Sequence, residues 1–156
     1  MPDTRPPATD GTEKGTLVGF LDYLRGSVID KIDGAPEPAV RTAAVPSGTN
    51  CLGLVKHLMH VERFMFLGED ADWLATFHAT ADETVMSVVA GYREAVTRAN
   101  AVIAGCEDLD QPCARPARKG AVPSMRWALT HMIEETARHA GHLDILREQM
   151  DGVTGR

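Results

Sequence analysis

Apolar residues recur along four stretches of the chain with the spacing of one buried helical face. In residues 16–32 this face consists of Leu17, Phe20, Leu21, Leu24, Val28 and Ile32. Residues three and four positions apart lie on the same side of a helix, so the spacing predicts an amphipathic helix that packs against a core. Gly34, Pro36 and Pro38 follow directly and favour the end of this helix.

A second helix is predicted at about residues 51–67, after a proline-containing connection at residues 35–47. Ser47 or Thr49 is its expected N-cap, because a side-chain oxygen there can accept a free backbone N–H of the first turn. The apolar face is formed by Leu54, Val55, Leu58, Val61 and Met65. His57 lies on one flank of this face.

The third predicted helix starts with a capping box. Thr80 and Glu83 have the required types and spacing, with Thr80 as N-cap. The helix continues to about Ala104. Its inward positions are Val85, Val89, Tyr92, Val96, Ala99 and Ile103. This face is again wide enough to be buried against neighbouring helices.

The fourth predicted helix covers residues 124–151, with Ser124 as N-cap, and follows a long proline-containing loop at residues 105–123. No stretch shows a convincing strand pattern. The sequence therefore predicts an all-α protein, a four-helix bundle with long crossover connections. Residues 1–12 are expected to be a disordered tail, and residues 13–152 a single four-helix-bundle domain.

Composition narrows the possible partners and the compartment. The chain has 156 residues and a net charge of −6, which disfavours nucleic acid or an anionic membrane as a partner. No signal peptide is recognisable near the N-terminus, and no apolar run approaches the roughly 20 residues of a membrane span. Three cysteines without a Cys-x-x-Cys pair fit neither a disulfide framework nor a zinc ribbon. We expect a cytoplasmic protein.

The stretch at residues 130–143 carries the candidate chemistry, since it holds three of the six histidines. At about 100° per residue, His139 falls inside the apolar face of the fourth helix and Glu135, one turn earlier, at its edge. Side chains four residues apart can reach one ion together. Burying such a pair without partners would cost several kcal/mol, of order 2–7 on transfer scales.

A facing helix can complete a metal site, as is common inside helical bundles. His57 is the best candidate, and with Glu135 and His139 it gives two nitrogens and one oxygen. This set suits zinc with an open fourth position, and nickel, iron or manganese would also accept it. The alternative is that these residues are hydrogen-bonded core histidines and a helix-surface pair. His60 and His131 are expected at the surface or behind the ligands.

Three segments together resemble a known superfamily. They are residues 53–58 (GLVKHL), residues 61–63 (VER) and residues 127–147. They are similar to the DinB-like (DinB/YfiT-like) superfamily of metal-binding four-helix bundles. Within this superfamily they more closely resemble the actinobacterial branch that includes mycothiol S-transferases and, more distantly, the mycothiol-dependent maleylpyruvate isomerase.

The resemblance implies a divalent metal held by His57, Glu135 and His139. Many members have histidine where this chain has Glu135, and the isomerase branch has glutamate. Many also have glutamine where this chain has His142. Three roles are considered for His142: a hydrogen-bond donor to one of the metal ligands, a proton shuttle, or an additional ligand. Members of the superfamily often form dimers, so the resemblance also implies a possible homodimer.

The resemblance further implies a metal-dependent thiol transferase with mycothiol as co-substrate. The thiol, deprotonated at the metal, would attack an electrophile. Arg118 and Lys119 in the long loop either receive polar groups of a substrate or are solvated charges. Two alternatives stay open: a non-enzymatic, stress-related metal-binding bundle, and a metal-assisted hydrolase. No phosphate-binding glycine loop, HExxH motif or Ser-His-Asp order points to another enzyme class.

Overall fold

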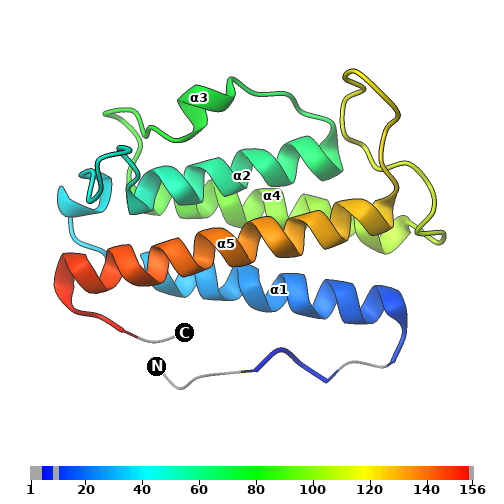
Figure 1. Ribbon diagram of the computed structural model, residues 1–156, viewed down its shortest axis with the longest axis horizontal. Helices are drawn as coiled ribbons and strands as arrows, with labels where there is room; N and C mark the ends of the chain where they lie inside the picture. Colours follow the sequence, from blue (N-terminus) through cyan, green and yellow to red (C-terminus); the bar gives the residue numbers. More distant parts are fainter. Residues whose placement is uncertain (1–4, 9–10, 155–156) are drawn as a thin grey trace.

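Four long helices lie side by side in the computed structural model, which describes residues 5–8 and 11–154. They are α1 (Glu13–Ile32), α2 (Cys51–Leu67), α4 (Val85–Gly105) and α5 (Met125–Asp151). A short 3-10 turn, η1 (Ala39–Arg41), and a single-turn helix, α3 (Trp73–Thr76), lie in the connections (Figure 1). The prediction of an all-α helical bundle is confirmed. The predicted tail at residues 1–12 lies partly outside the described residues.

The bundle is built from two helix pairs. α1 packs along α5, α2 packs along α4, and α2 also contacts α5. The connection at residues 33–50 carries the chain from α1 to α2, and residues 106–124 carry it from α4 to α5 (Figure 1). α3 lies against the outer side of α2. Side chains from α2 and α5, far apart in the sequence, can therefore meet.

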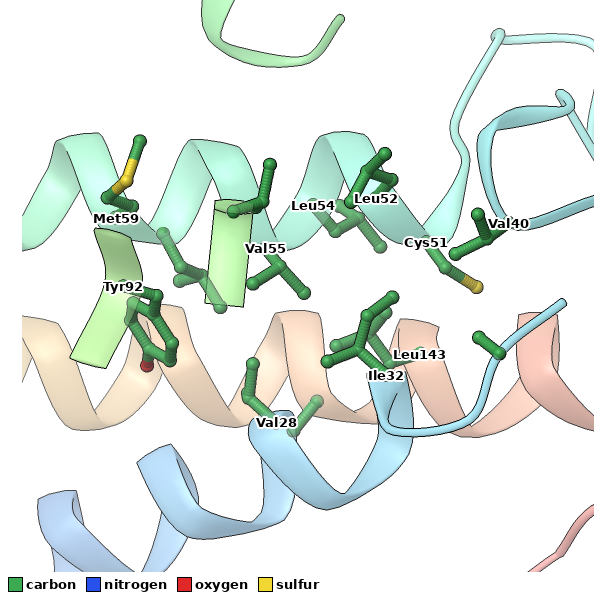
Figure 2. Packing of buried hydrophobic residues seen from close by; sticks show 14 of the residues in the cluster. Val28, Ile32, Val40, Cys51, Leu52, Leu54, Val55, Met59, Tyr92 and Leu143 are labelled. Carbon is green, nitrogen blue, oxygen red and sulfur yellow. The ribbon is translucent and has the colours of Figure 1, made fainter. Parts of the chain in front are cut away.

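The core consists of two apolar clusters along the bundle. The first includes Val28, Ile32, Val55 and Leu143, which point toward one another from α1, α2 and α5 (Figure 2), and Leu52 of α2 belongs to it as well. The second includes Leu21, Met65, Phe66, Leu129 and Met132. Full burial of each such side chain contributes about 1.5–3 kcal/mol to the free energy of folding. In the part of the chain that is described, no helix combines the length and apolar character that a membrane crossing requires.

The N-cap of α2 differs from the sequence prediction. Asn50, rather than Ser47 or Thr49, accepts a hydrogen bond through Oδ1 from the backbone N–H of Gly53 at 2.8 Å. The hydroxyls of Ser47 and Thr49 bond each other instead, with their oxygens 2.9 Å apart. The predicted start of the helix was correct. The cap was wrong because the side chain directly before Cys51 is the one that reaches the first turn.

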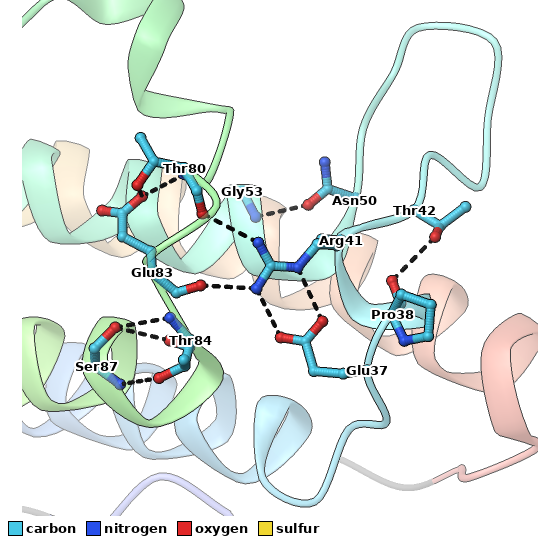
Figure 3. Close-up of polar contacts among 10 residues, drawn as sticks. All are labelled: Glu37, Pro38, Arg41, Thr42, Asn50, Gly53, Thr80, Glu83, Thr84 and Ser87. Carbon is cyan, nitrogen blue, oxygen red and sulfur yellow. Dashed lines mark hydrogen bonds and ion pairs between the residues drawn. The ribbon is translucent and has the colours of Figure 1, made fainter.

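The start of α4, in contrast to that of α2, was predicted too early. Its N-cap is Thr84, whose hydroxyl accepts from the backbone N–H of Ser87 at 3.1 Å while Ser87 Oγ accepts from the N–H of Thr84 at 2.9 Å. The predicted pair does interact, since the N–H of Thr80 donates to Glu83 at 2.7 Å. This contact closes a turn ahead of the helix (Figure 3). A second capping box four residues later starts the helix itself.

A buried ion pair joins α1 to α2. Arg25 is 2% exposed and Glu62 is fully buried. The guanidinium donates two hydrogen bonds to this carboxylate, from Nε at 2.7 Å and from Nη2 at 2.6 Å. Its Nη1 also donates to Asp22 at 2.8 Å and to Asn100 of α4 at 2.7 Å. One arginine therefore connects three helices.

We predict that Arg25→Ala lowers the free energy of unfolding by about 3–5 kcal/mol, because it leaves the Glu62 carboxylate buried without its cation. Urea denaturation followed by circular dichroism measures this change. The double variant Arg25→Met/Glu62→Leu is expected to recover most of the loss. Arg98→Ala is the control: its exposed pair with Glu69 is worth about 1 kcal/mol or less. A loss below about 1 kcal/mol for Arg25→Ala would contradict the prediction.

Candidate metal centre

Two imidazoles and one carboxylate converge where α2 faces α5. Nε2 of His57, from α2, lies 3.1 Å from Oε1 of Glu135 on α5. Nε2 of His139, one turn further along α5, lies 3.1 Å from the same oxygen. The three possible ligand atoms all lie within 4.8 Å of one another. Both histidines are buried and the glutamate is half-buried. The structure thus brings together the three residues that the sequence analysis singled out.

The proton on His57 is placed by a threonine of α3. The hydroxyl of Thr76 donates to the carbonyl oxygen of Trp73 at 2.7 Å, so its hydrogen is already used. Nδ1 of His57 lies 2.9 Å from the same hydroxyl oxygen, which can only accept at this contact. The N–H of His57 is therefore at Nδ1. The lone pair of the neutral ring is at Nε2 and points toward Glu135.

His139 has a comparable partner on its own helix. Its Nδ1 lies 3.3 Å from Nδ1 of His142, so one of these rings donates its N–H to the other. When His139 is the donor, its Nε2 also presents a lone pair to Glu135. Partners of this kind fix the tautomer and the orientation of metal-binding histidines. The structure places His142 behind His139, in contact with it.

In this arrangement the lone pairs of two histidine nitrogens face a carboxylate oxygen, so hydrogen-bond acceptors face an acceptor. A carboxylate oxygen and the bare Nε2 of a neutral His57 repel one another at 3.1 Å unless a proton or a cation lies between them. Ligand atoms on one tetrahedral zinc ion are about 3.4 Å apart at the usual bond lengths. The spacing and the donor types of the triad therefore fit a divalent cation. Three protein ligands would leave one coordination position for another molecule.

A family model for mycothiol-S-transferase matches residues 16–152. The matched region includes α2, α5 and all three residues of the triad. The chain belongs to the mycothiol-S-transferase family. The resemblance inferred from the sequence is confirmed at the level of the family. No curated protein matches the chain.

The histidines draw the Glu135 carboxyl toward its ionised form in this family member. In the metal-free protein, hydrogen bonds from His139 and then from His57, made when each Nε2 carries a proton toward the shared oxygen, hold the pKa of Glu135 far below its ordinary value and outweigh the opposing effect of burial. The carboxylate is thus ionised throughout the physiological pH range. An ionised oxygen is the form that binds a metal.

Aromatic rings close one side of the triad. The ring of Phe77 stacks on His57, with centroids 4.0 Å apart and an interplanar angle of 14°. Trp73 meets His57 edge-on at 6.2 Å. The close approach depends on Gly53, because a Cβ at that position would lie 2.0 Å from the carbonyl oxygen of Phe77. The glycine lets the segment after α3 rest on α2 one turn before His57.

The remaining histidines of the sequence analysis lie apart from the triad. His131 stacks on Trp127 with centroids 4.8 Å apart, and its Nδ1 lies 3.6 Å from Glu134. His60 is half-buried, and burial and then the nearby Arg63 lower its pKa. Among the described residues, the group of side chains able to hold a metal contains neither of them.

The three cysteines and the two cations of the long loop were also considered in the sequence analysis. Cys51, Cys106 and Cys113 are free and buried. Burial raises the pKa of the Cys51 thiol to about 11, which keeps it protonated and unreactive at neutral pH. Arg118 pairs with Asp70 at 2.6 Å and lies over two aromatic rings, Phe64 and Trp73. Lys119 is exposed.

Thr76 was missed in the sequence analysis, because α3 is a single turn with no apolar period to mark it. We predict that Thr76→Val lowers the affinity for Zn²⁺ about 10- to 100-fold by removing the acceptor that orients His57. Competition with a chelating dye measures the affinity. Thr130→Val is the matched control, since its exposed hydroxyl also bonds a backbone carbonyl. Equal affinities of the two variants would refute the role of Thr76.

The lowered pKa of Glu135 has a consequence for stability. In the metal-free protein, a carboxyl with a depressed folded-state pKa stabilises the fold fully above its unfolded pKa of about 4.3 and progressively less below it. The difference in free energy of unfolding between wild type and Glu135→Gln should therefore shrink from pH 5.5 to pH 3. Urea denaturation at both values tests this. Glu134→Gln, on the exposed face beside it, is the control variant.

Proposed function

We propose that this protein is a metal-dependent S-transferase that joins mycothiol to an electrophile. The observation that carries the proposal is the convergence of His57, Glu135 and His139 within 4.8 Å of one another. The match to the mycothiol-S-transferase family supplies the type of thiol. Neither observation names the electrophile, and the type of reaction follows from the two together.

The donor set favours zinc as the cation, with nickel, iron and manganese as alternatives. A divalent cation bound there supplies positive charge that lowers the pKa of a coordinated thiol, so that the sulfur is nucleophilic at neutral pH. His57 and His139 would hold it through Nε2 and Glu135 through a carboxylate oxygen. Binding through Nε2 leaves the N–H of each ring at Nδ1, where Thr76 contacts His57 and His142 contacts His139.

The surrounding residues of the chain have separate tasks. Thr76 and His142 hold the two rings in orientation through contacts of 2.9 Å and 3.3 Å. Phe77 covers one face of His57 and keeps water from that side. A small thiol supplies the nucleophilic sulfur in this proposal, because all three cysteines of the chain are buried. Free thiols also suit the cytoplasm, where we place the protein.

Metal analysis together with a conjugation assay tests the proposed function. The purified protein is expected to bind about one equivalent of divalent metal and to accelerate conjugation of mycothiol to a chloroacetamide dye. His57→Ala/His139→Ala should lose the metal and fall to the uncatalysed rate. His131→Ala, outside the triad, should keep both properties.

Three results would count against the proposal. Full transfer activity in the metal-stripped double variant would remove the role of the triad. Hydrolysis without any thiol would indicate the metal-assisted hydrolase. Bound metal with no turnover over a panel of low-molecular-weight thiols would indicate the non-enzymatic bundle.

A further inference from the structure

A pocket of about 360 Å³ lies beside the triad, between the loop before α2 and the outer face of α5. Its lining residues are Val45, Ser47, Thr49, His142, Ile145 and Leu146. His142 connects the pocket to the triad, because its ring contacts His139. The volume lies within the range typical of small-molecule sites, about 300–1,000 Å³.

The pocket presents aliphatic surface on both of its sides. Val45 comes from the loop, while Ile145 and Leu146 come from α5. The two hydroxyls in the lining, those of Ser47 and Thr49, bond each other at 2.9 Å. Apolar walls with mutually satisfied hydroxyls favour an uncharged, apolar guest over a sugar or an anion.

Ile145 is the lining residue that exposes the apolar surface of the pocket to solvent. Its side chain is 59% exposed, and it lies almost three turns beyond Glu135 and almost two beyond His139 along α5. A single exposed isoleucine is ordinary on a protein surface. Here it borders a pocket that is separated from the triad by one side chain, His142.

The loop wall of this pocket is fixed to the rest of the bundle. Arg41 donates to the carbonyl oxygens of Thr80 and Glu83 at 3.1 Å and 2.7 Å, and two of its nitrogens bond Glu37 (Figure 3). Asn50 anchors the other end of the loop on α2 through its bond to Gly53. The pocket is therefore formed before any ligand arrives.

A neighbouring pocket of about 280 Å³ lies on the far side of the same loop. It shares Ser47 and Thr49 with the first pocket and adds Leu74, Phe77 and His78. The ring of Phe77 stands between this pocket and His57, on which it stacks. One side chain thus separates each pocket from the triad, and the first pocket is the one lined by α5, the helix that carries Glu135 and His139.

We propose that the pocket formed by Val45, His142, Ile145 and Leu146 binds the apolar body of the electrophile, so that the preferred substrates carry alkyl or aryl groups. This inference rests on the proposed function. With a chloroalkyl substrate, the thiolate sulfur forms a bond to carbon, and the carbon–chlorine bond breaks. Chloride leaves with the bonding electron pair, so no oxidant or further reactant is required.

A homologous series of N-alkyl chloroacetamides, from methyl to hexyl, tests the inference. With mycothiol as the thiol, kcat/KM is expected to rise about threefold to fourfold per methylene, because each one leaves water for an apolar wall. Ile145→Asn should flatten this dependence and leave KM for mycothiol unchanged. Met86→Asn is the matched control, since Met86 is a large apolar side chain on α4 that is 81% exposed.

The contrasting variant is Leu74→Asn, which alters the neighbouring pocket. If Leu74→Asn flattens the dependence on chain length and Ile145→Asn does not, the apolar body lies in the other pocket and the inference is overturned. It is equally overturned if all variants keep the dependence of the wild type.

Binding without chemistry separates this inference from the proposed function. N-hexylacetamide, which has no leaving group, is titrated into metal-free protein and followed by NMR chemical shifts. We expect it to shift the signals of Ile145, and Ile145→Asn to weaken its binding. If the wild type binds this probe but transfers no thiol, the proposed function fails, and the pocket is still shown to bind an apolar ligand.

The remaining outcome concerns a second copy of the chain. If sedimentation shows that Ile145→Asn weakens self-association while N-hexylacetamide does not bind the wild type, the surface is a dimer contact. That result would overturn the inference.

Discussion

The electrostatic conflict at Glu135 is the constraint on which the rest of the structure depends. One carboxylate oxygen lies 3.1 Å from Nε2 of His57 and 3.1 Å from Nε2 of His139. The bond from Thr76 leaves a neutral His57 without a proton to offer there. Such an arrangement is stable only with a positive charge between the three atoms, whether proton or metal. The packing of α2 on α5 has to keep these groups together against their own repulsion.

The bundle supplies that restraint in two ways. The apolar clusters run along both helix pairs and fix the distance between α2 and α5. The ion pair of Arg25 and Glu62 ties α1, α2 and α4 through one guanidinium group. Burying this pair brings little net stability compared with apolar side chains of similar size. Its directed bonds do, however, fix the rotation of α2, and with it the direction in which His57 points.

Periodicity predicted the four long helices because each buries a wide apolar face, and the i, i+4 spacing placed Glu135 and His139 together. The facing position of His57 also followed from its place beside an apolar stripe. Other contacts between distant segments escaped prediction: neither Arg25 nor Glu62 carries a local signal that it is buried. Thr76 and Phe77 lie in a short irregular connection, where no repeat reveals which atoms approach α2. The caps at Asn50 and Thr84 were missed because several capping residues cluster before each helix.

Gly53 links the backbone of α2 to the aromatic cover over His57. The carbonyl oxygen of Phe77 occupies the space where any other residue would carry its first side-chain carbon. The hydrogen atom at this position therefore acts as a spacer that sets how deeply the aromatic cover sits over His57. A methyl group there would lift the cover as a unit and expose the imidazole face to solvent. The exposure of the His57 ring is thus set in part by a residue that offers no chemistry of its own.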